Sequence, residues 1–302
     1  MDLKSLFKPA SMAVIGVSTS QDIHPANVIY NKNNLRYPVK TFPVNPKGGF
    51  LNREKLYTGV SDIDESVELA VIAVRAEHVP GVMKECIKKG VKGAVIISAG
   101  FAETGNMKAQ QYLADLAEEA DFPFIGPNCL GVFSPDYVDT FFLPGERIIR
   151  PDKGNVAFVS QSGGVLVDQF VKFSSQGIGI SLAVSIGNKA LIRETDMLDW
   201  LANDMETKAI AFYIEGFDKG EGRHFIKKAE KCGKPVVILK AGKSKKGMEA
   251  VSSHTASLAG DYRVFSEIMK QHCIADAENE FELTSFCEAL SCYPKQGING
   301  NI

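Results

Sequence analysis

Short apolar runs rich in valine and isoleucine alternate with amphipathic stretches along almost the whole chain. Runs of this kind, flanked by glycines and helical patterns, are typical of strands buried in a parallel sheet. In the first half they predict strands at 12–17, 39–44, 69–74, 93–98 and 123–125, with helices at 77–89 and 106–120. In the second half they predict strands at 155–159, 179–184, 208–214 and 235–239, with helices at 164–175, 194–203 and 223–231.

Regular alternation of strands and helices indicates right-handed βαβ units. The stretch 135–153 is rich in proline, glycine and charge, and it predicts a linker. We therefore expect the α/β fold class, with two doubly wound domains in series over 1–145 and 146–302. A chain of 302 residues is long enough for each domain to bury its own core.

Charge and cysteine usage exclude several functional classes. The formal net charge of −2 lacks the basic surplus of nucleic-acid-binding proteins. No apolar run approaches the roughly 20 residues needed to cross a membrane, and the first residues lack the apolar core of a signal peptide. The six cysteines are scattered without a C-x-x-C pair, which indicates reduced thiols. We expect a cytoplasmic protein with no metal site and neither nucleic acid nor membrane as a partner.

The residues that follow the predicted strands are unusual in composition. In doubly wound sheets, ligands bind in the crevice beyond the carboxyl ends of the strands. Glycines, hydroxyl residues and lysines occupy nearly every one of these positions, at 16–21, 45–49, 98–101, 126–129, 160–164, 185–189, 215–217 and 240–243. This composition predicts a phosphate-binding surface at the carboxyl ends of the strands in each domain.

The first domain lacks the pattern of an NAD site. A dinucleotide-binding turn has G-x-G-x-x-G after the first strand, whereas Gly16 is followed by no glycine until Gly48. An NAD site also carries an acid after its second strand, where this chain has Asn45-Pro46-Lys47. A lysine there suits a phosphate on the ribose, as in coenzyme A, and NADP is a less favoured alternative. Taken alone, Lys47 is equally consistent with a solvated turn residue.

The second domain combines a helix start, a strand-end acid and one histidine. Ser162-Gly163-Gly164 lies between a predicted strand and a helix, whose free N–H groups suit a phosphate. His254 stands among small and hydroxyl residues, which suits an imidazole that becomes phosphorylated, although a polar loop with an incidental histidine is the alternative. Glu215 ends an apolar strand and could hold one ring nitrogen of His254. Lysines precede the histidine at Lys240, Lys243, Lys245 and Lys246.

Five motifs in order carry a resemblance to a known family. They are Val14-Ile15-Gly16, Asn45-Pro46-Lys47-Gly48-Gly49, Ile125-Gly126-Pro127-Asn128-Cys129-Leu130-Gly131, Val159-Ser160-Gln161-Ser162-Gly163-Gly164 and Ser253-His254-Thr255-Ala256-Ser257-Leu258-Ala259-Gly260. Together they resemble the CoA-binding and CoA-ligase domains of the nucleoside-diphosphate-forming acyl-CoA synthetases. The α subunit of succinyl-CoA synthetase has the same layout, and the segment around His254 is more similar to the ADP-forming acetate–CoA ligases.

The resemblance implies a Rossmann-like CoA-binding domain and a flavodoxin-like CoA-ligase domain. It implies that His254 is the phosphorylated nucleophile, that Glu215 orients it, and that the helix starting at Ser162, Gly163 and Gly164 holds the phosphate. Positions that correspond to CoA contacts in the family are Gly16, Ser18, Thr19, Ser20, Gln21, Lys47, Ser98, Ala99 and Asn128. In the first loop, Thr19 and Ser20 replace a glycine and a lysine that are common in the family.

The implied reaction is acyl-CoA + ADP + phosphate ⇌ carboxylic acid + ATP + CoA. The resemblance implies that ADP/ATP and Mg are bound by an ATP-grasp β subunit, so we expect a hetero-oligomer whose small-molecule partners are CoA, phosphate and a small carboxylic acid. It also implies a further α/β domain that is on another chain, absent or removed. A non-catalytic regulatory CoA-binding module with the same fold is the alternative from another functional class.

Overall fold

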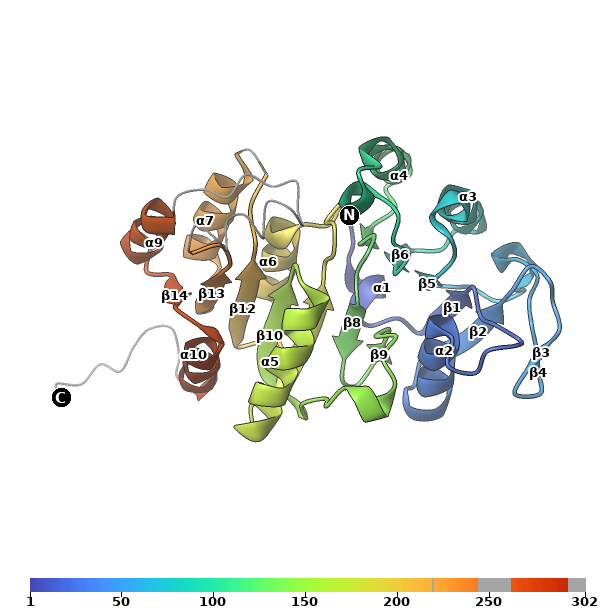
Figure 1. Ribbon diagram of the computed structural model, residues 1–302, viewed down its shortest axis with the longest axis horizontal. Coiled ribbons are helices and arrows are strands. Elements are labelled where there is room, and N and C mark those ends of the chain that lie inside the picture. The colour runs from blue at the N-terminus through green and yellow to red at the C-terminus, as the bar shows by residue number, and fades with distance from the viewer. Residues whose placement is uncertain (219, 244–261, 293–302) are drawn as a thin grey trace. The chain divides into compact units, whose positions relative to one another are not determined.

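The computed structural model describes residues 1–218, 220–243 and 262–292 (Figure 1). The chain forms two compact units. Unit 1 consists of Met1–Ile148 and Val184–Ile192, and unit 2 consists of Ile149–Ala183 and Arg193–Ile302. His254, the predicted nucleophile, lies outside the described residues. Within the described ranges, every helix is too short or too polar to cross a membrane.

Unit 1 is built on a five-stranded sheet in the order β2-β1-β5-β6-β7. All four strand pairs are parallel, and the register runs from Ser11 opposite Lys40 to Ile15 opposite Val44 in the first pair. The strands of unit 1 are β1 Ser11–Ile15, β2 Lys40–Val44, β3 Phe50–Leu51, β4 Glu54–Lys55, β5 Leu69–Ile72, β6 Gly93–Ile96, β7 Phe124–Ile125, β8 Gly131–Ser134 and β9 Val138–Asp139. Its helices are α1 Lys4–Phe7, α2 Pro25–Arg36, α3 Val79–Lys89 and α4 Met107–Glu119, with 3₁₀ turns η1 Val60–Asp62, η2 Ala76–His78, η3 Ala102–Thr104 and η4 Gly145–Arg147.

In unit 2, the strands follow one another in the order β14-β13-β12-β10-β11. The pairs β10–β12, β12–β13 and β13–β14 are parallel. The strands are β10 Lys153–Ser160, β11 Ile180–Ser185, β12 Ala209–Ile214, β13 Val236–Lys240 and β14 Ala275–Ala277. The helices are α5 Gly163–Ser175, α6 Glu194–Asn203, α7 Glu221–Lys231, α9 Tyr262–Gln271 and α10 Glu280–Cys292.

The direction of each crossover decides which face of a sheet its helix covers. In unit 1, α2 covers one face beside β1 and β2, and α3 and α4 cover the other (Figure 1). In unit 2, α5 and α10 pack together on one face, and α6 packs beside α7 on the other. Both units therefore have two helical layers around a parallel sheet, which confirms the predicted α/β fold class.

Every strand and helix predicted from the apolar pattern is present, with ends that differ by at most two residues. Helix α2 was not predicted, because its buried face carries Asn27 and Asn33 and so lacks an apolar stripe. The Asn33 amide donates to the backbone oxygens of Ile29 and Asp139, at 2.8 and 2.7 Å, which satisfies its buried polar atoms.

The predicted linker 135–153 is wrong for its first part. Strand β9 pairs antiparallel with β8, and residues 138–141 are buried. The buried Asp139 carboxylate forms an ion pair with the Lys32 ammonium at 2.7 Å. The same ammonium donates a hydrogen bond to the Phe141 oxygen at 2.6 Å. The first part of this stretch therefore forms a buried hairpin instead of a linker. The charge that it buries, on Asp139, is neutralised by Lys32 of α2.

A segment from the second half of the sequence belongs to unit 1. Val184–Ile192 packs there through Leu191, which joins the same apolar core as Phe101 and Ile96. Its backbone also bonds to the turn after β7, with N–H groups of Asn188 and Ala190 donating to the oxygens of Pro127 and Gly126 at 2.9 and 3.1 Å. The loop after β11 therefore becomes part of the carboxyl edge of the first sheet.

Candidate functional site

The strand order of unit 2 places a topological switch point between β10 and β12. The chain leaves β10 toward β11 on one side, and it returns to β12 on the other. Ligands in doubly wound sheets bind at such points, beyond the carboxyl ends of the strands. In the parallel register Ser160 lies opposite Tyr213, so the residues that follow, Ser162 and Glu215, come from adjacent strand ends. The structure thus brings these two predicted site residues to one edge.

The amide of Gln161 joins the two strand ends across this switch point. Its Oε1 accepts the backbone N–H groups of Glu215 and Gly216, at 2.7 and 3.2 Å. Its Nε2 donates to the Gly216 oxygen at 2.8 Å and to the Glu194 carboxylate. Gln161 and Glu194 are buried, so these bonds are shielded from water. Although Gln161 lay within a quoted motif, sequence reasoning assigned it no role.

The predicted phosphate-binding helix starts where the sequence indicated. Helix α5 begins at Gly163, with Ser162 as its N-cap in an extended conformation. The Ser162 hydroxyl accepts the N–H of Val165 at 3.4 Å, and its own N–H donates to the Ser160 hydroxyl at 3.1 Å. Gly164 is exposed and Gly163 is partly exposed, so the first turn is accessible to a ligand.

Two of the lysines predicted to attract anions are engaged with backbone oxygens. Lys240 is buried at the end of β13, and its Nζ donates to the oxygens of Glu215 and Ala241 at 2.6 and 2.7 Å. Burial lowers the pKa of Lys240 to about 8, against the opposing effect of the Glu215 charge. Lys243 Nζ donates to the oxygens of Ala277 and Glu278, at 2.6 and 2.9 Å. Both ammonium groups therefore act within the fold.

The strand order of unit 1 is equivalent, with its switch point between β1 and β5. Gly16 follows β1 with φ +105°, and an added Cβ would lie 2.4 Å from the oxygen of Ala73. The Ser18 hydroxyl accepts the N–H groups of Ser20 and Gln21, at 3.2 and 3.1 Å. These two donors are therefore already satisfied within the loop, while the side chains of Thr19, Ser20 and Gln21 are exposed.

Asn27 of α2 holds this first loop. Its Oδ1 accepts the Ser18 N–H at 2.7 Å, and its Nδ2 donates to the oxygens of Ser18 and Gln21 at 2.8 and 3.1 Å. Asn27 is completely buried, and sequence reasoning missed it. Asn27 lies six residues after Gln21, inside a helix, and no pattern of charge or glycine marks it in the sequence.

The loop after β2 lies beside the loop after β1. A Cβ added to Gly49 would lie 3.5 Å from the Thr19 side chain, which brings these two loops together. Asn45 shapes the turn, because its Oδ1 accepts the Lys47 N–H at 2.8 Å and its Nδ2 donates to the Val17 oxygen at 2.6 Å. The Lys47 side chain is exposed beside the switch point, as a ribose-phosphate contact requires.

The ends of β6 and β7 meet through backbone and side-chain bonds. The Ser98 hydroxyl is buried and donates to the Val74 oxygen at 2.6 Å, so it serves the fold, while Ala99 is exposed. The Asn128 N–H donates to the Ser98 oxygen at 2.9 Å, and Asn128 adopts φ +57°. Its side chain is exposed and donates to Asn188 Oδ1 at 3.2 Å.

Asn188 connects this turn to a carboxylate. Its Nδ2 donates to Glu103 and to Gln110 Oε1, the latter at 2.9 Å. Burial raises the pKa of Glu103, but hydrogen bonds from Asn188 and from the N–H groups of Gly100 and Phe101 together bring it below its usual value. Sequence reasoning grouped Asn188 with the second domain and therefore missed its place beside Asn128.

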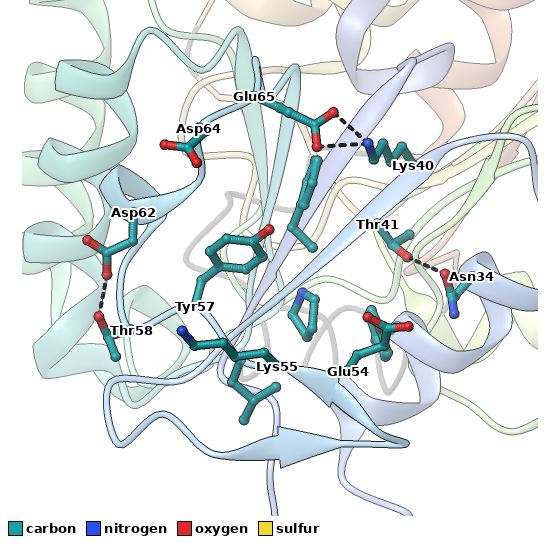
Figure 2. A pocket seen from close by; sticks show the side chains of 14 residues that line it. Asn34, Lys40, Thr41, Glu54, Lys55, Tyr57, Thr58, Asp62, Asp64 and Glu65 are labelled. Atoms are coloured by element: carbon teal, nitrogen blue, oxygen red, sulfur yellow. Dashed lines mark hydrogen bonds and ion pairs between the residues drawn. The ribbon is translucent and has the colours of Figure 1, made fainter.

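A pocket of about 660 Å³ lies along the outer edge of β2, where Figure 2 shows Tyr57 between a Lys40–Glu65 ion pair of 2.6 Å and a Thr58–Asp62 hydrogen bond. None of the predicted site residues lines it. In residues 1–218, 220–243 and 262–292, no cluster of three or more His, Cys, Asp or Glu side chains is suited to a metal ion.

Two parallel α/β units with the same switch-point topology define the class of protein, and comparisons with known proteins identify the family. A CoA binding domain model matches residues 10–135, and a model of the succinyl-CoA ligase like flavodoxin domain matches residues 153–290. The chain therefore belongs to the proteins that join a CoA binding domain to a succinyl-CoA ligase like flavodoxin domain.

Individual relatives agree over nearly the whole chain. The ADP-forming acetate–CoA ligase I of Archaeoglobus fulgidus is 38% identical over 299 residues, which cover 98% of this chain and 43% of that protein. The α subunit of ADP-forming acetate–CoA ligase I of Pyrococcus furiosus is 37% identical, over 99% of this chain and 66% of the subunit. The chain therefore spans less than two thirds of these relatives.

A solved structure gives the same result. Acetyl-coenzyme A synthetase 1 of Candidatus Korarchaeum cryptofilum, in complex with phosphate and ADP, superposes with a TM-score of 0.89 and 35% identity. The match covers 97% of this chain and 63% of that chain. The predicted Rossmann-like and flavodoxin-like folds are thereby confirmed, and the match to a CoA binding domain does not support the NADP alternative.

Proposed function

We propose that this chain is the α-type part of an ADP-forming acyl-CoA synthetase, an acid–thiol ligase of the acetate–CoA ligase type. The reaction is acyl-CoA + ADP + phosphate ⇌ carboxylic acid + ATP + CoA, which conserves thioester energy by ATP synthesis. The observation that carries this proposal is the placement of Ser162 and Glu215 just after adjacent strand ends at the switch point of unit 2, in a chain that also has a CoA binding domain.

Unit 1 would bind coenzyme A along the carboxyl edge of its sheet. The exposed Thr19, Ser20 and Gln21 would contact the cofactor after β1, with Gly16 permitting the close turn and Ser18 shaping the loop. Lys47 would contact the 3′-phosphate, since its side chain is exposed beside this loop. The ends of β6 and β7 would lie nearer the thiol, with Ser98, Ala99 and Asn128 forming that part of the edge.

The chemistry would begin when a phosphate oxygen attacks the thioester carbon. The C–S bond breaks, CoA leaves as the thiol, and an acyl phosphate forms. A ring nitrogen of His254 then attacks phosphorus, the bond to the acyl oxygen breaks, and the carboxylate leaves. Two easier transfers thus replace one difficult transfer.

Glu215 would accept the N–H of the other ring nitrogen of His254, which selects the reactive tautomer. The first turn of α5, at Ser162, Gly163 and Gly164, would stabilise the charge on the transferring phosphoryl group with its N–H groups. These roles fit the described geometry, because Glu215 and Ser162 lie on adjacent strand ends.

Phosphohistidine would pass its phosphoryl group to ADP on a partner. In this proposal the strand ends of unit 1 bind CoA and those of unit 2 serve the phosphohistidine, so ADP/ATP with Mg would be bound by an ATP-grasp β subunit or domain. The working protein would then be a hetero-oligomer or a larger chain, in the cytoplasm, with CoA, phosphate and a small carboxylic acid as its ligands.

Labelled phosphate tests this function directly. The complete enzyme, containing this chain and its ATP-grasp part, is incubated with acetyl-CoA and ³²P-phosphate, and protein-bound label is tested for acid lability. We expect acid-labile label that is lost in His254→Ala, while CoA binding is retained. Turnover by His254→Ala at the wild-type rate would overturn the assigned nucleophile. A regulatory CoA module predicts CoA binding without any label.

A further inference from the structure

Glu215 lies one residue beyond the last paired residue of β12, where the ladder no longer holds its backbone. Side chains from the ends of the two neighbouring strands, β10 and β13, hydrogen-bond to its main chain instead. Gln161, after β10, accepts the Glu215 N–H at 2.7 Å, and Lys240, the last residue of β13, donates to the Glu215 oxygen at 2.6 Å. Both polar groups of this residue's main chain are thus held by side chains.

The Gln161 amide is fixed in one orientation by its surroundings. A backbone oxygen can only accept hydrogen bonds, so the Gly216 oxygen selects the NH₂ end of the amide, which also donates to Glu194. The oxygen end must then face the N–H groups of Glu215 and Gly216. Turning the amide over would bring like groups together at these three backbone contacts in a buried site.

The Lys240 ammonium is directed inward in the same way. The residue is 7% exposed, and its ammonium donates hydrogen bonds to the oxygens of Glu215 and Ala241. A buried lysine costs free energy because its charge is desolvated. An apolar residue would fill this position at the end of a buried strand without that cost, so the buried charge indicates a specific role for the ammonium group.

We propose that Gln161 and Lys240 are positioning residues, which fix the main chain of Glu215 so that its carboxylate meets the nucleophilic histidine in one geometry. The inference rests on the proposed function of Glu215. Catalytic groups must be held within roughly 0.5 Å of the productive arrangement, and a displacement of about 1 Å can reduce a rate on the order of 100-fold.

The test replaces each residue by methionine, which keeps the volume and removes the hydrogen bonds, in the complete enzyme. For Gln161→Met and Lys240→Met we expect kcat to fall roughly 10- to 100-fold. The KM for CoA should stay within about twofold, because the CoA edge belongs to unit 1. The amount of phosphohistidine formed in the first turnover should fall with kcat.

Each variant has a matched control in unit 2. Lys234, before β13, donates to the oxygens of Leu201 and Asp204, so Lys234→Met removes the same kind of bond at the opposite end of the strand. Gln169 is a buried glutamine whose amide donates to Thr284 at 2.7 Å, so Gln169→Met is the second control. Both controls should lose stability to a similar extent and keep wild-type kcat below their unfolding temperature.

The outcomes separate this inference from the function on which it rests. If Glu215→Gln abolishes labelling while both methionine variants match their controls in kcat, the positioning role is wrong and the function stands. If Glu215→Gln keeps full turnover, the role of Glu215 itself is wrong. Should a methionine variant not fold, Gln161→Asn and Lys240→Arg are measured instead. Gln161→Asn is too short to reach the Glu215 N–H and should have a reduced kcat, whereas Lys240→Arg keeps a donor for the Glu215 oxygen and should retain part of the wild-type kcat; wild-type kcat in Gln161→Asn would overturn the positioning role.

Discussion

The N–H of Glu215 donates to the side chain of Gln161 over 2.7 Å, so a residue after β10 holds the main chain after β12. The two residues are 54 positions apart in sequence and meet where the strand order reverses. A crevice at such a point is open by construction, because consecutive crossovers leave it on opposite faces. The amide therefore connects the two strand ends beyond the last residues that the ladder pairs.

Replacing Glu215 by glutamine removes the charge and keeps the backbone bonds. We expect Glu215→Gln to lower kcat by about 10²-fold, since a neutral amide cannot select and stabilise the charged imidazole. The unfolding free energy should fall by about 1 kcal/mol or less, because the residue is partly exposed and keeps its main-chain partners, while the nearby Lys240 ammonium loses a favourable charge. Single-turnover labelling and denaturant unfolding measure the two quantities, and a large loss of stability would contradict this separation.

The buried ammonium of Lys240 predicts a pH dependence of stability. Its pKa in the folded protein is lowered by burial from 10.5 to about 8, so the unfolded chain holds more protons between these values. The wild-type unfolding free energy should therefore rise, relative to that of Lys240→Met, as the pH increases from about 8 to 10.5. Urea unfolding at four pH values in this window measures the difference.

An exposed lysine provides the control for this pH series. The hydrogen bond from Lys270 to Glu267 raises the pKa of Lys270, so its stabilising charge is kept throughout the same window. Lys270→Met should show no relative rise of the wild type between pH 8 and 10.5. A flat difference for Lys240→Met would mean that water reaches the Lys240 ammonium.

The predicted strands could be found from the sequence because the middle of each one is an apolar run that the fold buries. All residues of β5, β6 and β12 except Tyr213 are buried, so no polar position interrupts the signal. Helix α2 could not be predicted by the same rule, since its inward face carries Asn27. The role of such an asparagine can be recognised only from its tertiary partner, which here is the first loop.

The candidate site could be predicted in part for a related reason. Strand ends rich in glycine and hydroxyl residues pointed to the carboxyl edges of the two sheets, and Ser162 is the N-cap that its position indicated. The contacts of Gln161 and Asn188 depend on which strands become neighbours in the sheet. The spacing of residues along the sequence does not reveal which strands these are. The docking of Val184–Ile192 in unit 1 is of the same kind, because it depends on the close approach of Gly187 to the turn after β7.

Gly187 should not tolerate a side chain. Its φ is +56°, and an added Cβ would lie 2.4 Å from the Pro127 oxygen. Gly187→Ala should lower the unfolding free energy by roughly 2–4 kcal/mol, because a backbone shift is required as well as a left-handed alanine. Gly177 has φ +67° and open space around a Cβ, so Gly177→Ala isolates the left-handed cost of about 1–2 kcal/mol. Equal losses in the two variants would refute the close contact.

The Asn188 amide should stabilise unit 1 in a pH-dependent way. Asn188→Ala leaves Glu103 without a donor that lowers its pKa, and we expect a loss of about 1–3 kcal/mol at neutral pH. Because the folded pKa of Glu103 is depressed, this stability is present above its unfolded pKa and is lost as the pH falls through the folded one. The difference between wild type and Asn188→Ala should therefore shrink below about pH 4.5.

Asn203 supplies the comparison for this acid series. It is an exposed asparagine whose amide donates to the backbone oxygen of Asp199 at 2.9 Å, so it touches no carboxylate. Asn203→Ala should give a small loss that does not change between pH 7 and 3. A parallel pH dependence in both variants would show that Glu103 is not the group involved.

The Lys47 side chain should distinguish CoA from dephospho-CoA, which lacks the 3′-phosphate. Its main chain is fixed by Asn45 at 2.8 Å and its side chain is exposed, so Lys47→Ala should leave the turn intact. We expect CoA affinity to fall by about 1–3 kcal/mol if the ammonium contacts the 3′-phosphate. Dephospho-CoA should bind wild type and Lys47→Ala almost equally, as measured by calorimetry. Lys88→Ala, in the last turn of α3, is the control and should bind both ligands like the wild type. An equal loss for CoA and dephospho-CoA would place Lys47 against another part of the cofactor.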